Sequence, residues 1–91
     1  MKITYWVHAI QRMYERGIST ADVRAVLEGG KTIESYPEDA SSPGRLVLGW
    51  RGEHPLHVVV ADLSTADEAV IVTAYEPDTE QWESGFERRK A

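Results

Sequence analysis

The sequence contains no cysteine, and this absence removes several kinds of site at once. Disulfide bonds, thiolate-bound metals and catalysis by a cysteine nucleophile are all excluded. A chain of 91 residues without disulfides depends for its stability on a single hydrophobic core, or on a partner. We therefore expect one domain that spans residues 1–91.

Long apolar runs are missing as well. No segment approaches the roughly 20 apolar residues that a membrane-spanning helix needs. Residues 1–5 show neither the apolar run nor the small-residue cleavage site of a secretory signal. These absences predict a protein of the cytosol without a membrane partner. The content of 42% hydrophobic and 27% charged residues is typical of a soluble globular chain.

Positive charge is scarce, because ten Lys and Arg stand against fifteen Asp and Glu, a net charge of −5. A chain that binds nucleic acid through charge alone carries a basic surface, so this balance argues against a generic nucleic-acid binder. The acids are concentrated towards the C-terminus: residues 1–51 carry seven Lys or Arg against six acids, and residues 52–91 carry three against nine. A neutral-to-basic face built from the first part is still compatible with the sequence.

The hydrophobic spacing predicts two helices near the N-terminus. Apolar residues recur with helical spacing over residues 6–16, and Gly17 follows them. Ser19, with Asp22 three residues later, is the start signal of a second helix, which the glycine pair beginning at Gly29 ends. The apolar stripe of the first helix consists of Trp6, Ile10, Met13 and Tyr14.

After the second helix the period of the pattern becomes two, which is the spacing of strands. We predict strands at residues 31–36, 45–51, 56–62 and 69–75, and a C-terminal helix from about 79 to 89. Short connections between consecutive strands indicate an antiparallel meander with helices on one face. The predicted fold is therefore α+β, with two N-terminal helices, a four-stranded antiparallel sheet and a C-terminal helix.

The predicted sheet has one apolar face, which we expect to pack against the helices, and one mixed face. If the two turns centre near His54 and Ala66, Arg51 lies opposite His57, and His57 lies opposite Tyr75. These three residues then form a row across neighbouring strands at one end of the mixed face. The apolar face consists of Leu46, Leu48, Trp50, Leu56, Val58, Val60, Val70, Val72 and Ala74.

This row contains the groups that metal-independent RNA cleavage needs. Histidine suits a general base or acid because its unperturbed pKa is about 6.5, arginine binds phosphate through a planar, permanent charge, and tyrosine donates a hydrogen bond or stacks on a base. Arg51, His57 and Tyr75 are therefore candidate catalytic residues, and Arg45 and Thr73 on the same face are candidate RNA-binding residues. The alternative is that all are structural or solvated.

The first predicted helix carries a second polar group, on the face opposite its apolar stripe. His8, Arg12, Glu15 and Arg16 share that face. His8 and Arg12 are candidates for the rim of the catalytic site, and the alternative is a solvated face with a charge cluster.

Two further groups of residues have a binding interpretation. Arg88 and Arg89 are candidate ligands of RNA phosphate, or else they complement the C-terminus of the last helix. His54 and His57 suggest a metal site, but strand alternation points them to opposite faces and the sequence offers no third ligand. We predict neither a metal nor a cofactor.

A series of short sequence elements resembles a known family over nearly the whole chain. In order, these elements are His8-Ala9, Arg12-Met13, Glu15-Arg16-Gly17-Ile18-Ser19, Asp22-Val23, Val26-Leu27, Ile33-Glu34, Tyr36-Pro37, Leu48-Gly49, Leu56-His57-Val58-Val59, Thr73-Ala74-Tyr75, Pro77 and Trp82. Their order and spacing resemble the family named domain of unknown function 4258, whose members are similar to the RelE-like and barnase-like (BECR) endoribonucleases. The resemblance implies a RelE-like fold, and its polar site positions fall on His8, Arg12, His57 and Tyr75.

The resemblance and the residues leave two functions open. The first is a type II toxin that cleaves mRNA and is neutralised by an antitoxin of zinc-finger or helix-turn-helix character. In it His57 is the base or acid, Arg51 and Arg12 bind phosphate, Tyr75 donates or stacks, and His8 is a second proton-transfer group. The second is a non-catalytic interaction module, whose mixed sheet face and acidic C-terminal helix bind a protein partner or a second copy of the chain.

Overall fold

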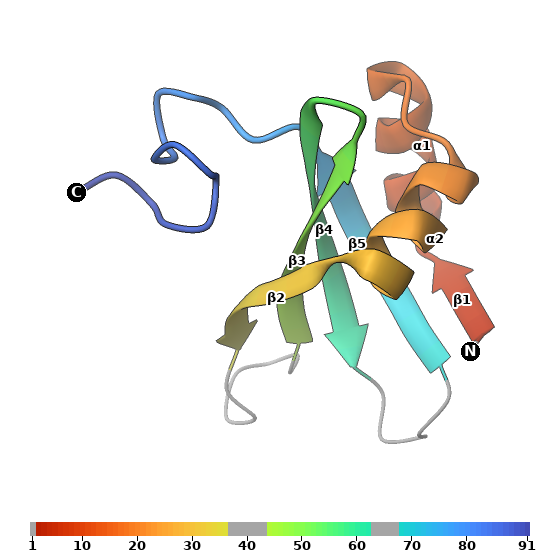
Figure 1. Ribbon diagram of the computed structural model, residues 1–91. Helices are drawn as coiled ribbons and strands as arrows, with labels where there is room; N and C mark the ends of the chain where they lie inside the picture. The colour runs from red at the N-terminus through yellow and green to blue at the C-terminus, as the bar shows by residue number, and fades with distance from the viewer. Residues whose placement is uncertain (1, 37–43, 63–67) are drawn as a thin grey trace.

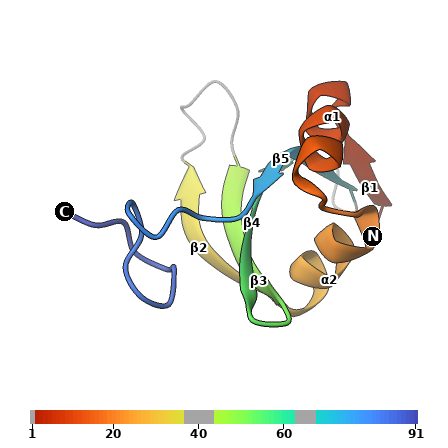
Figure 2. The ribbon, with the colours of Figure 1, turned by 90° about the horizontal axis from the view of Figure 1, so that it is seen from above.

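The computed structural model of the protein describes residues 2–36, 44–62 and 68–91. The elements are β1 (Lys2–Tyr5), α1 (Val7–Arg16), α2 (Thr20–Gly29), β2 (Lys31–Tyr36), β3 (Gly44–Arg51), β4 (His54–Asp62) and β5 (Glu68–Tyr75). The strands form one sheet in the order β1-β5-β4-β3-β2. Both helices lie on one side of this sheet, and the chain after β5 lies on the other (Figures 1 and 2). None of the helices in the described ranges is long and apolar enough to cross a membrane.

The helix boundaries follow the local signals in the sequence. At the start of α2 the Ser19 hydroxyl accepts a hydrogen bond from the Asp22 backbone at 3.0 Å, and the Asp22 carboxylate accepts one from the Ser19 backbone at 2.9 Å. This reciprocal pair is the predicted capping box. α1 ends at Gly17, whose φ of 68° is in the left-handed region that glycine adopts without strain. The predicted end of α1 and the predicted start of α2 are therefore both confirmed.

The main core lies between the two helices and the sheet. Gly49 marks a close approach within it, because a Cβ added there would lie 2.7 Å from the Val26 side chain. α2 therefore crosses β3 at a distance that only glycine permits. The buried core residues are Ala9, Met13, Ile18, Val23, Val26, Val47, Leu56, Val58, Val60, Ala69, Ile71 and Ala74.

The prediction of a four-stranded antiparallel sheet behind two N-terminal helices is wrong. β1 precedes the helices and pairs in parallel with β5, which makes the sheet five-stranded and mixed. The Thr4 hydroxyl also donates to the Glu68 carboxylate, 64 residues further along the chain. Four residues are too few for a period to be read, and a parallel pairing this distant leaves no local signal. The predicted RelE-like arrangement, in which both helices come before all the strands, is therefore wrong, because β1 precedes the helices.

The predicted C-terminal helix is wrong as well. Residues 76–91, called here the C-terminal cover, cross the second face of the sheet as irregular chain with one isolated bridge between Trp82 and Arg89. Gly85 and Phe86 both have positive φ, 91° and 60°, which no right-handed helix contains. The four-residue spacing of Trp82 and Phe86 is the same as in a helical stripe, but both side chains reach the sheet from irregular chain. The Trp82 ring contacts His57, and the Phe86 ring contacts Trp50.

The orientation of β3 also differs from the prediction. Leu48 pairs with His57, so Leu46, Leu48 and Trp50 point towards the C-terminal cover and not towards the helices. Val47 faces the helices in their place. The cover buries the second face of β3, so this strand is apolar on both sides and its alternation cannot show which side meets the helices.

Candidate functional site

The predicted catalytic row is only half assembled. His57 does lie opposite Tyr75, with their ring centres 5.4 Å apart. Arg51 instead pairs with His54 and belongs to the face that carries the helices. The turn is a two-residue loop of Gly52 and Glu53, with Gly52 at φ 64°, so its centre lies before His54 and the expected register is wrong.

His57 is a packed residue of the second face. Its side chain is 0% exposed, and the Trp82 ring stands edge-on to it with centroids 4.4 Å apart. Nε2 lies 2.9 Å from the Phe86 carbonyl and Nδ1 lies 3.4 Å from the Tyr75 hydroxyl. Because a carbonyl only accepts, Nε2 carries the proton and Nδ1 accepts from the tyrosine. Burial lowers the pKa of His57, so the ring is held neutral and away from any substrate.

The C-terminal cover also engages part of the predicted RNA-binding set. Arg89 stacks 4.7 Å from the centre of the Trp82 ring, and its Nε and Nη2 donate to the two oxygens of Glu34 at 3.1 and 3.3 Å. Arg89 therefore fastens the cover to β2. Arg88 is exposed beside Glu83 at the outer surface of the cover. Arg89 thus lies on the far side of the Trp82 ring, whose edge-on partner is His57.

The remaining predicted residues are distributed over the molecule. His8 and Arg12 are exposed on α1, where Arg12 Nη1 lies 3.6 Å from the Glu15 carboxylate. α1 packs against β5 on the side of the sheet away from His57, so these residues do not join it (Figure 2). Arg45 lies near the opposite end of β3 from Arg51.

A different cluster forms where β3 begins its turn and β5 ends. A pocket of about 290 Å³, called here the end-of-sheet pocket, lies at this edge. It brings together two residues of the predicted row, Arg51 and Tyr75, although they approach from different faces of the sheet. Its lining residues are Arg16, Ile18, Arg51, Tyr75 and Glu76.

Arg16 reaches this pocket from the last turn of α1. β1 pairs with β5 as far as Ile71, and beyond that point the Arg16 side chain contacts the outer edge of β5. Its Nη1 donates to the Ala74 carbonyl at 2.9 Å and to the Thr73 hydroxyl at 3.4 Å. Thr73, a predicted RNA-binding residue, thus helps to place a guanidinium group beside the pocket.

Arg51 is held on the opposite wall. Its Nη1 donates to the Gly17 carbonyl at 2.8 Å and to the Asp22 carboxylate at 3.1 Å. The Ser19 backbone N–H lowers the pKa of Asp22, and the Ser19 hydroxyl and then the Arg51 guanidinium lower it further, so this carboxylate stays ionised. Among the described residues, Arg16 and Arg51 make their contacts through Nη1, which leaves Nε and Nη2 of each planar group for an anion.

A histidine–carboxylate pair adjoins this pocket, because Glu76 is one of its lining residues and His54 contacts Glu76. His54 Nδ1 lies 3.1 Å from Glu76 Oε1, and both side chains are exposed. A carboxylate on Nδ1 fixes the orientation of the ring and leaves Nε2 as the nitrogen that takes up a proton. Sequence reasoning considered His54 only as a metal ligand and did not consider Glu76. The glycine at Gly52 was the available signal, because a two-residue turn there places His54 opposite Arg51.

The fold and the cluster together define a small α+β domain with a polar pocket at one end of its sheet. The chain belongs to the family described as a domain of unknown function (DUF4258), whose model matches residues 5–76. The matched span includes all the residues of the end-of-sheet pocket and stops where the C-terminal cover begins. Comparison with curated proteins and with solved structures finds no match.

Proposed function

We propose that the protein is a metal-independent endoribonuclease that acts at the end-of-sheet pocket. One observation carries the proposal: Glu76, which holds the His54 ring, lines the same pocket as two arginines. Two planar cations suit a phosphodiester, and a carboxylate-oriented imidazole suits the removal of a hydroxyl proton. The family resemblance to toxin endoribonucleases supports the same class of reaction.

In the proposed reaction, Nε2 of His54 takes the proton of the RNA 2′-hydroxyl. The 2′-oxygen then forms a bond to phosphorus, and the bond from phosphorus to the 5′-oxygen breaks. Water protonates the departing 5′-oxygen, so the products are a 2′,3′-cyclic phosphate and a free 5′-hydroxyl. Arg16 and Arg51 stabilise the charge that builds up on the phosphoryl oxygens, and Glu76 stabilises the imidazolium.

The biological setting that we propose is a type II toxin–antitoxin pair in the cytosol, with mRNA as the substrate. A cognate antitoxin would then neutralise the protein by covering the pocket. Single-stranded RNA suits this site because a flexible backbone can bend into a shallow pocket at a sheet edge.

The test compares two exposed histidines. His54→Ala and His8→Ala are purified and incubated with single-stranded RNA, and the cleavage rate and the end groups are measured. We expect His54→Ala to lower the rate by about 100-fold or more, with cyclic phosphate ends in the wild type, and His8→Ala to cleave RNA as the wild type does. If His8→Ala loses activity and His54→Ala retains it, the site lies on α1 and the pocket assignment is wrong. Wild-type protein that leaves RNA intact overturns the proposal.

A second function, binding of a protein partner, is favoured by the outer face of α1. Four apolar side chains are exposed there, Trp6, Val7, Ile10 and Tyr14, with exposed fractions of 47%, 87%, 44% and 88%. An apolar stripe of this kind is unusual on a monomer. Under this proposal Ile10→Glu converts a dimer or a stable complex into monomer in light scattering. A wild type that is monomeric, and that no co-expressed neighbouring gene product binds, contradicts it.

A further inference from the structure

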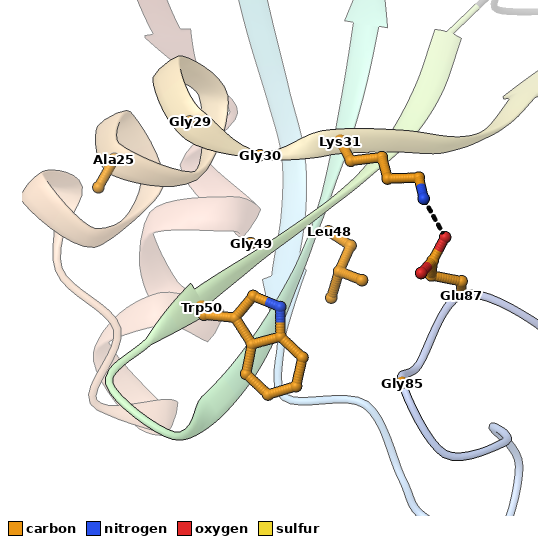
Figure 3. A pocket seen from close by; sticks show the side chains of 9 residues that line it. All are labelled: Ala25, Gly29, Gly30, Lys31, Leu48, Gly49, Trp50, Gly85 and Glu87. Carbon is orange, nitrogen blue, oxygen red and sulfur yellow. Dashed lines mark ion pairs between the residues drawn. The ribbon is translucent and has the colours of Figure 1, made fainter.

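A larger pocket, of about 520 Å³, lies against the second face of β3 (Figure 3). We call it the Trp50 pocket. Its walls come from the end of α2, the start of β2, the end of β3 and the C-terminal cover. The lining residues are Ala25, Gly29, Gly30, Lys31, Leu48, Gly49, Trp50, Gly85 and Glu87.

The Trp50 indole is the principal surface of this pocket. It is 50% exposed, because the pairing of β3 with β2 ends at Leu48 and leaves the end of β3, within the described ranges, without a neighbouring strand on that side. The Phe86 ring contacts it edge-on, with centroids 6.0 Å apart, and so holds it in place without covering it. In Figure 3 the indole and the Leu48 side chain project into the space in front of β3.

A charged pair stands across the pocket from the indole. Lys31 at the start of β2 forms an ion pair with Glu87 of the cover, and Figure 3 shows this pair at the pocket's far side. Both side chains are substantially exposed, with side-chain exposed fractions of 66% and 45%. An ammonium group and a carboxylate together offer donors and acceptors to a flat ring that lies on the indole.

Open space adjoins this surface, because glycines line much of it. A Cβ added at Gly29 or Gly85 would meet no atom within 4 Å. At Gly49 the lining is closely packed from behind, since an added Cβ there would lie 2.7 Å from the Val26 side chain. The pocket therefore has open space beside Gly29 and Gly85 and close packing behind Gly49, and its volume is in the range of small-ligand sites.

We propose that the Trp50 pocket binds an unpaired nucleobase of single-stranded RNA, stacked on the indole with its edge towards Lys31 and Glu87. This inference deepens the proposed endoribonuclease function and rests on it. Trp50 and Arg51 are consecutive residues whose side chains leave β3 on opposite faces. An RNA strand that passes over the tip of the β3–β4 hairpin contacts both, so a base bound on Trp50 sets which phosphate reaches the end-of-sheet pocket.

Stacking explains how a chain with net charge −5 would hold RNA. A base on an aromatic ring needs no positive field, whereas a surface that holds RNA by phosphate contacts alone does. By the usual effect of removing one stacking ring, we expect loss of the indole to weaken binding by about 5- to 150-fold.

The experiment separates binding from cleavage by using a short single-stranded RNA with 2′-O-methyl groups, which has no 2′-hydroxyl to react. Its dissociation constant is measured for the wild type, Trp50→Ala, Trp50→Phe and the matched control Trp6→Ala, whose indole is exposed to a similar degree on α1. We expect a 5- to 150-fold loss for Trp50→Ala, near wild-type binding for Trp50→Phe and no change for Trp6→Ala. An abasic strand of equal length should bind the wild type as weakly as the RNA binds Trp50→Ala.

Equal affinity of Trp50→Ala and the wild type, with thermal melts that show both folded, overturns the inference, and so does equal affinity for the abasic strand. The two proposals fail in different ways. Binding that depends on Trp50, without any cleavage of natural RNA, sinks the endoribonuclease and retains the base pocket. Cleavage that depends on His54 but not on Trp50 retains the endoribonuclease and sinks the base pocket.

Discussion

Replacement of His57 by alanine distinguishes a packed histidine from a catalytic one. The side chain is fully buried, so its removal leaves a cavity between the Trp82 ring and β4. The change also takes away the donor to the Phe86 carbonyl and the acceptor of the Tyr75 hydroxyl. Both effects lower the stability of the folded state, and neither removes any of the groups to which the reaction is assigned, Arg16, Arg51, His54 and Glu76.

The magnitude follows from these contacts. Truncation of a large buried side chain to alanine costs about 2–5 kcal/mol, and a buried polar group left without a partner costs about 1–3 kcal/mol. Because water can reach the half-buried Tyr75, we expect a total loss near the lower end, about 3 kcal/mol. A domain of this length is stable by about 5–14 kcal/mol, so the variant stays folded at low temperature while its melting temperature falls by about 12–24 °C.

The assay is thermal and urea unfolding followed by circular dichroism, with cleavage of RNA measured well below the melting temperature. His57→Gln is the conservative variant, because its amide can still donate to the Phe86 carbonyl, and we expect it to lose about 1–2 kcal/mol. His54→Ala changes an exposed side chain and should stay within about 0.5 kcal/mol of the wild type. If His57→Ala keeps its melting temperature and loses cleavage, His57 is catalytic and the packing argument is wrong.

Two further predictions concern the same core and its titration. Burial lowers the pKa of His57 below its ordinary value of 6.5, so below that pH the unfolded chain binds a proton that the folded chain does not. The contribution of the neutral His57 to the free energy of unfolding should therefore be fully present above about pH 6.5 and should decrease as the pH falls from there. Urea unfolding of the wild type at pH 7.5 and 5.5 should show this loss of stability. An equal loss in His57→Gln would show that His57 is not its source. Gly49→Ala should lower stability by about 1–3 kcal/mol, because its Cβ would force α2 away from β3. Gly29→Ala, with nothing within 4 Å, is the control and should be neutral or slightly stabilising.

Local features of this protein could be predicted from its sequence. The capping box of Ser19 and Asp22 and the glycine at the end of α1 involve residues within one helical turn, so they are visible in the chain itself. The pairing of His57 with Tyr75 was also predicted, since strand alternation and a short connection restrict the register. Family membership was recognised from the same ordered short elements, and the match to residues 5–76 bears it out.

Only the tertiary structure decided how the functional groups meet. The parallel pairing of β1 with β5 and the approach of Arg16 to β5 join residues that are far apart in the chain. Thr4 and Glu68 are separated by 64 positions, and Arg16 and Thr73 by 57. The same is true of the C-terminal cover, which buries His57 and makes β3 apolar on both faces. Sequence periodicity reports which residues share a face of one element. Which element covers that face depends on the packing of the whole chain, and this packing buried His57 and left His54 exposed opposite Arg51.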